Sequence, residues 1–70
     1  MSKGNLLASA GTLESIREAI TDFYCGSSKT LIPDGADKWR VVGTYDSEAI
    51  PMLGVIVVKR RGRYRFEMVV

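Results

Sequence analysis

Helical periodicity occurs in one stretch of this chain, residues 12–25, and a single helix limits the architectures that the other residues can complete. Apolar side chains recur there at helical spacing, so they fall on one stripe: Leu13, Ile16, Ala19, Ile20, Phe23 and Tyr24. Thr12 can cap the start of the helix with its hydroxyl, and Gly26 can end it in the left-handed conformation. The pattern predicts one amphipathic helix that needs a partner surface.

Two β-prone runs, residues 55–60 and 63–70, enclose the dipeptide Arg61-Gly62. A two-residue turn between them would fix the register of a hairpin. One face of that hairpin would then pair Lys59 with Tyr64, Val57 with Phe66 and Val55 with Met68, and the other would pair Arg60 with Arg63, Val58 with Arg65 and Ile56 with Glu67. Because Arg61-Gly62 is not Asn-Gly, a looser loop with a shifted register is the alternative.

The middle of the chain combines a second hairpin signal with one irregular segment. Residues 30–32 and 38–42 are β-prone and flank the turn-forming run 33–37, which predicts a hairpin. Residues 43–54 contain Asp, Ser, Glu and Pro at positions that disfavour a continuous central strand. We therefore expect a loop over 43–54 that packs over an edge of the sheet.

These elements predict an α+β fold, with a single small domain over residues 12–70 and a flexible N-terminal arm over residues 1–11. One N-terminal amphipathic helix would pack on an antiparallel sheet of 3–4 strands, in the order helix, hairpin, loop, hairpin. The helix stripe would cover a floor of inward-facing side chains: Leu31, Trp39, Val41, Val55, Val57, Tyr64, Phe66 and Met68.

One helix covers one face of a sheet, so the opposite face would stay open. Its apolar members would be Val42, Ile56, Val58 and Val69, set among charged residues. A chain of 70 residues with one cysteine has no intrachain disulfide to compensate for a small core. We therefore predict a homodimer formed through this face or through an edge strand, with an adequate monomer as the alternative.

The densest charge lies at the C-terminal hairpin, where five basic residues give +5: Lys59, Arg60, Arg61, Arg63 and Arg65. The other five basic and eight acidic residues sum to −3. Such a cluster can neutralise phosphates, which makes nucleic acid one candidate partner and an acidic protein another. Positive side chains also keep exposed strands from pairing with other chains, and this protective role is the interpretation that the cluster by itself favours.

Residues suited to catalysis are scarce in this chain. It has no histidine, and the lone Cys25 follows a helix whose C-terminal dipole disfavours a thiolate, which favours a half-buried structural cysteine. The loop carboxylates fit ordinary turn chemistry better than a metal site or an acid/base pair: Asp34, Asp37, Asp46 and Glu48. We predict a non-enzymatic interaction module with no metal, cofactor or small-molecule substrate.

The cellular setting is constrained by apolar runs and by cysteine usage. No apolar run approaches the roughly 18 residues that a membrane span needs, so we expect no membrane partner. A single cysteine is typical of a reducing compartment, and we expect a cytoplasmic protein. Self-association is the leading functional interpretation of the sequence, and nucleic-acid binding by the basic 59–65 hairpin is the alternative.

Overall fold

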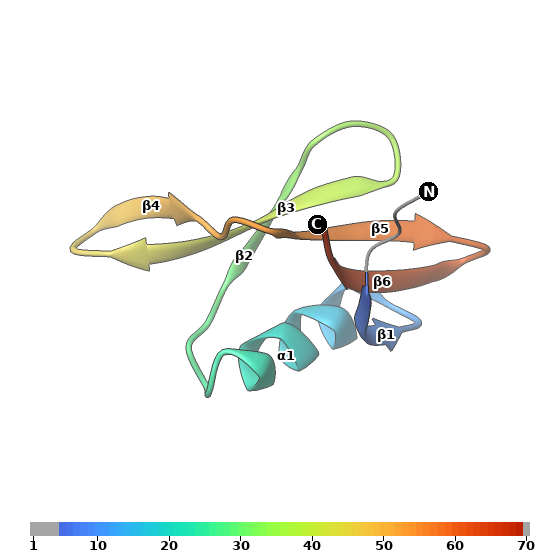
Figure 1. The fold of residues 1–70 in the computed structure, drawn as a ribbon, viewed down its shortest axis with the longest axis horizontal. Coiled ribbons are helices and arrows are strands. Elements are labelled where there is room, and N and C mark those ends of the chain that lie inside the picture. The colour runs from blue at the N-terminus through green and yellow to red at the C-terminus, as the bar shows by residue number, and fades with distance from the viewer. Residues whose placement is uncertain (1–4, 70) are drawn as a thin grey trace.

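The computed structural model describes residues 5–69, which form one helix and a six-stranded sheet (Figure 1). The elements are β1 (Asn5–Ala10), α1 (Leu13–Phe23), β2 (Thr30–Pro33), β3 (Lys38–Tyr45), β4 (Glu48–Pro51), β5 (Val55–Arg60) and β6 (Arg63–Met68). The strand order is β1-β6-β5-β3-β2, β4 also pairs with β3, and all pairs are antiparallel. The α+β class is confirmed, but the expected 3–4 strands are too few.

Helix α1 begins at the predicted residue and ends slightly earlier than residue 25. The Thr12 hydroxyl accepts a hydrogen bond from the backbone N–H of Ser15 at 3.1 Å, which is the expected N-cap. At the other end, the Gly26 N–H donates to the Thr21 carbonyl at 2.8 Å, the bond of a Schellman motif. Gly26 is left-handed as predicted (φ 90°), and Cys25 before it also has positive φ (59°).

The predicted flexible arm over residues 1–11 is wrong for residues 5–10, which form strand β1 against β6. The pairing runs from Asn5 opposite Met68 to Ala10 opposite Tyr64, with a bulge between Leu6 and Ala8. Leu7, inside the bulge, packs against the core together with Ala8 and Ala10. A segment of weak β propensity therefore becomes a strand because it gains apolar contacts and covers the free edge of β6. Residues 1–4 and 70 lie outside the described residues.

The predicted loop over 43–54 is also wrong, because β3 continues to Tyr45 and returns as β4. The two-residue turn consists of Asp46 and Ser47, both at positive φ (53° and 68°). Asp tolerates this conformation, so a residue that weakens a strand interior supplies a tight hairpin turn instead. Pro51 ends β4, an edge strand, where proline is tolerated.

The other two hairpins are confirmed. Strand β2 pairs with β3 from Thr30 opposite Val42 to Pro33 opposite Trp39. Strands β5 and β6 pair in the predicted register throughout, from Val55 opposite Met68 to Arg60 opposite Arg63. Arg61 and Gly62 both have positive φ (53° and 76°), as a type I′ turn requires, so the looser loop does not form. Figure 1 shows that the β3–β4 and β5–β6 hairpins extend in opposite directions.

The core lies between α1 and the sheet, and its fully buried side chains are Ile16, Ile20, Val41, Val57 and Phe66. Helix α1 packs mainly on β1 and β6. Most of the predicted floor lies in or against this core, including Leu31, Trp39, Val55 and Tyr64. Met68 is the exception: it lies at the end of β6 and is 38% exposed.

Candidate functional site

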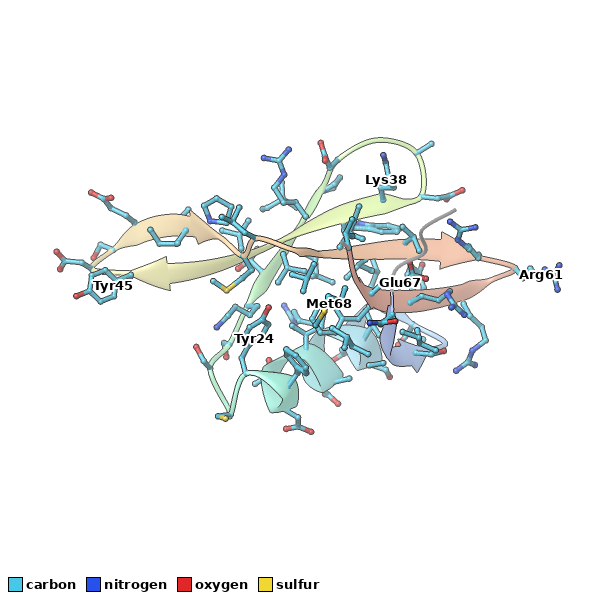
Figure 2. The ribbon with its side chains drawn as sticks, in the orientation of Figure 1. Tyr24, Lys38, Tyr45, Arg61, Glu67 and Met68 are labelled. Atoms are coloured by element: carbon cyan, nitrogen blue, oxygen red, sulfur yellow. The ribbon has the colours of Figure 1, made fainter. Side chains whose placement is uncertain are left out.

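Three neighbouring strands carry basic side chains on the sheet face that α1 does not cover. In β3, Trp39 and Val41 pack toward the core. Because side chains alternate along a strand, Lys38 and Arg40 point away from the core. Figure 2 shows Lys38 on the side of the sheet opposite α1. The same alternation holds in β5 and β6, where Val57 and Phe66 are buried. We call the resulting set the basic face: Lys38, Arg40, Arg60, Arg63 and Arg65.

The strand register brings these residues together from separate parts of the chain. Arg60 lies directly opposite Arg63 across the β5–β6 hairpin. Val58 of β5 pairs with Arg65 on one side and with Lys38 on the other. Since neighbouring strands lie about 4.8 Å apart, the backbones at Arg65 and Lys38 are separated by roughly 10 Å. The positive charges therefore form a band that runs from β6 across β5 to β3.

One end of the basic face is concave. An open hollow of about 390 Å³ is lined by Ser9, Arg60, Arg61, Arg63 and Arg65. Arg61 belongs to the type I′ turn, and Ser9 comes from β1, which pairs with β6 at Arg65. We call this feature the arginine hollow. Four arginines from one hairpin thus surround a single space that an anionic group could enter.

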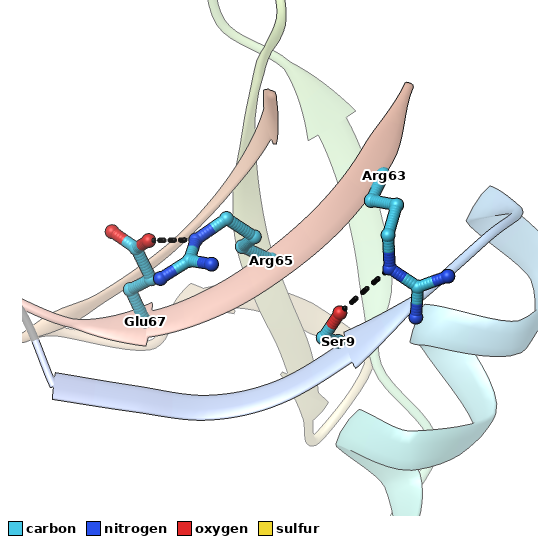
Figure 3. Close-up of polar contacts among 4 residues, drawn as sticks. All are labelled: Ser9, Arg63, Arg65 and Glu67. Carbon is cyan, nitrogen blue, oxygen red and sulfur yellow. Dashed lines mark hydrogen bonds and ion pairs between the residues drawn. The ribbon is translucent and has the colours of Figure 1, made fainter. Parts of the chain in front are cut away.

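Hydrogen bonds orient two arginines of the hollow (Figure 3). Arg63 donates from Nε to the Ser9 hydroxyl oxygen at 3.2 Å. Arg65 donates from Nε to a carboxylate oxygen of Glu67 at 2.7 Å, the closest ion pair on this face. Among residues 5–69, Arg60, Arg61 and Arg63 form no ion pair with a carboxylate. Most of the positive charge at the hollow is therefore available to a ligand.

The hollow and the predicted basic cluster overlap but are not identical. Lys59 is outside the hollow, because alternation turns it to the opposite face, where its ammonium lies 5.5 Å from the centre of the Tyr64 ring. Sequence reasoning missed Lys38 and Arg40, although the alternation Lys-Trp-Arg around a predicted core residue was a usable signal. It also missed Ser9, since the pairing of β1 with β6 has no local signature.

The four residues predicted for self-association do not form one apolar patch. Val58 is only 7% exposed, so it offers little surface to a partner. Ile56 is half-buried and lies opposite Glu67, and Val69 is exposed beyond the end of β6. Val42 lines a separate open hollow of about 370 Å³, together with Ile32, Pro33, Asp34, Arg40, Ala49 and Pro51.

The loop carboxylates divide between two hairpins. The Asp34 carboxylate forms an ion pair with Arg40 at 3.3 Å. At Asp37 the backbone carbonyl accepts a hydrogen bond from the backbone N–H of Lys59 at 2.9 Å. Asp46 and Glu48 belong to the β3–β4 hairpin, whereas Asp34 and Asp37 lie in the connection between β2 and β3. Within residues 5–69, no group of three His, Cys, Asp or Glu side chains is placed to hold a metal ion.

Cys25 is exposed, not half-buried, because the helix ends before it. In the described part of the chain, no helix has the length and apolar character needed to cross a membrane.

No family model, curated protein or solved structure matches this chain.

Proposed function

We propose that this chain is a small non-enzymatic binding module that attaches to the phosphate backbone of nucleic acid through the basic face. The observation that carries the proposal is the arginine hollow, in which Arg60, Arg61 and Arg63 have no carboxylate partner among the described residues. A guanidinium group presents a planar fork of N–H donors that matches two phosphate oxygens. Lys38 extends the same positive band onto β3, toward neighbouring phosphates, while Arg40 beside it is ion-paired with Asp34 at 3.3 Å.

The placement of the aromatic side chains favours a duplex over a single strand. Single-stranded nucleic acid is held by stacking its bases on exposed aromatic rings beside basic residues. Here Trp39, Tyr64 and Phe66 all lie on the core side of the sheet, so the basic face offers arginines without a stacking platform. Contacts to phosphates alone position a protein on DNA or RNA without reading the sequence. We therefore expect binding with little sequence preference and a strong dependence on salt.

Fluorescence anisotropy with a labelled duplex and its separate strand tests the proposal at about 50 mM and about 200 mM salt. We expect wild-type protein to bind the duplex and to weaken steeply as salt rises. The double variant Arg60→Gln/Arg63→Gln should lose most of this binding. The control Arg17→Gln, which removes an exposed charge from α1, should keep it.

Two results would redirect the proposal. Equal duplex binding by wild type and by Arg60→Gln/Arg63→Gln would remove the arginine hollow from the account. If an acidic peptide binds in a salt-sensitive way and the duplex does not, the partner is an acidic protein.

Self-association is the second candidate function, and exposed apolar side chains on the β3–β4 hairpin favour it. Tyr45 is 77% exposed, Leu53 after β4 is 88% exposed, and all four residues of β4 are exposed. Large apolar side chains on a projecting hairpin are typical of an interaction surface. Light scattering coupled to size-exclusion chromatography tests this candidate, because a stable dimer would have twice the 7.7 kDa mass of the chain.

A further inference from the structure

We infer that copies of this chain associate head to tail, with the turn of the β3–β4 hairpin of one copy seated in the arginine hollow of the next. The turn and its flanking residues, Tyr45, Asp46, Ser47 and Glu48, are all exposed, and we call them the acidic tip. Residues 41–58 contain two carboxylates, those of Asp46 and Glu48, and no lysine or arginine. The acidic tip therefore carries negative charge without a neighbouring cation in its own segment.

The acidic tip and the arginine hollow lie at opposite ends of the molecule. Figure 2 shows Tyr45 and Arg61 at the two ends of the longest axis, which measures 36 Å. Because the two surfaces are this far apart, one copy does not satisfy its own hollow with its own tip. A second copy supplies the complementary charge at each end.

The shapes and chemistry of the two ends also match. The tip is a two-residue turn, so Asp46 and Ser47 project as a narrow knob flanked by the pair Tyr45 and Glu48. Its carboxylates can accept N–H groups from the guanidinium forks that line the hollow. The exposed ring of Tyr45 can lie against an arginine, and tyrosine and arginine are enriched among the residues that dominate binding energy.

A contact between two different surfaces repeats from copy to copy. Such heterologous contacts give open chains unless their geometry closes a ring, whereas a two-fold dimer uses the same surface twice. The inference rests on the proposed function in one respect, because both require the arginine hollow to accept anionic groups. Nucleic acid and the acidic tip would therefore compete for the hollow, and added duplex should shorten the chains.

A pair of one-sided variants tests the inference by light scattering. Asp46→Asn/Glu48→Gln removes the charge of the tip and keeps the hollow, while Arg60→Gln/Arg63→Gln weakens the hollow and keeps the tip. At about 50 mM salt the wild-type mass should rise with protein concentration, and at about 500 mM salt it should return to the monomer mass of 7.7 kDa. Each variant alone should stay monomeric. An equimolar mixture should form a dimer and nothing larger, because the one functional tip meets the one functional hollow.

The outcomes separate this inference from the proposed function. A wild-type mass of 7.7 kDa at every protein concentration up to about 1 mM and at low salt would overturn the inference. The head-to-tail contact that we infer has a dissociation constant of about 1 mM or less, which corresponds to a binding free energy of about −4 kcal/mol. The inference would also be overturned if either variant alone associated to the same extent as the wild-type protein. The tip variant retains the full basic face, so its duplex binding tests the proposed function independently of self-association. Far-UV circular dichroism and melting curves that match wild type confirm that both variants fold, as their exposed positions predict.

Discussion

Lys59 and Arg60 are adjacent in the sequence but project to opposite faces of the sheet. The ammonium of Lys59 lies 5.5 Å from the centre of the Tyr64 ring, on the side of the core, whereas Arg60 lines the arginine hollow. The alternation of a β-strand causes this division, and the type I′ turn at Arg61 fixes its register. The run of basic residues is therefore divided between the two faces of the sheet, and the proposed binding surface is one face rather than the whole run.

The first prediction compares these two neighbours. Each phosphate contact that is lost should reduce the slope of log K against log salt by about 0.9 for duplex DNA. Arg60→Gln should show this reduction, while Lys59→Gln should leave the slope close to that of wild type. Salt titrations followed by anisotropy measure both. Equal losses in the two variants would mean that total charge, and not the face, determines binding.

The second prediction concerns Lys38, which lies outside the C-terminal hairpin. Because it pairs with Val58 across from Arg65, it extends the positive band onto β3. Lys38→Gln should weaken duplex binding and lower the salt slope by about the same 0.9. The same titration measures the effect. Wild-type binding by this variant would confine the site to the arginine hollow.

The third prediction tests strand β1 with two adjacent leucines. Leu7 packs against the core, whereas Leu6 is 48% exposed. Leu7→Ala should lower the free energy of unfolding by about 1–3 kcal/mol, and Leu6→Ala by much less, because only the former removes buried apolar surface. Urea denaturation measures both values. A flexible arm would instead give two equally small effects.

The fourth prediction distinguishes burial from exposure at two valines predicted for self-association. Val58 is 7% exposed and Val69 is 51% exposed. Val58→Ala should destabilise the fold by about 1–2 kcal/mol, while Val69→Ala should change stability by less than about 0.5 kcal/mol. Chemical denaturation of the monomer at high salt provides the comparison. The reverse order would contradict the packing of β5.

The fifth prediction concerns alkaline pH. Burial of the Tyr24 phenol raises its pKa above the ordinary value of 10. Above pH 10 the unfolded chain therefore ionises before the folded chain, and this residue makes stability fall as pH rises. Tyr24→Phe should reduce that loss. Melting temperatures of wild type and this variant between about pH 8 and pH 11 measure the difference.

The local signals in the sequence predicted the elements that depend on neighbouring residues. Helix α1 has its cap at Thr12, and the β5–β6 register follows from a two-residue turn. Two segments were mispredicted because their structure depends on distant partners or on turn chemistry. Residues 5–10 become a strand only against β6, and Asp46 and Ser47 were interpreted as strand breakers although they form a hairpin turn.

The residues of the candidate site also divide into those with a local signal in the sequence and those that depend on distant strand pairing. Four arginines of the hollow were predicted from their density in the sequence. Ser9 joins them through a strand pairing that spans most of the chain, and Lys38 joins them through the pairing of β3 with β5. Charge density alone groups Lys59 with the arginines, but the register predicted from the two-residue turn places Lys59 beside Tyr64 on the opposite face, and the structure confirms it.

NMR titration of isotope-labelled protein with a short duplex tests the central claim most directly. We predict that shifts concentrate on the amides of the basic face and on the Arg60 and Arg63 Nε–H groups, with Ile16 and Ile20 in α1 unaffected. These shifts should reverse when salt is raised to about 500 mM. Shifts centred on α1, or no shifts at low salt, would contradict the assignment of nucleic-acid binding to this face.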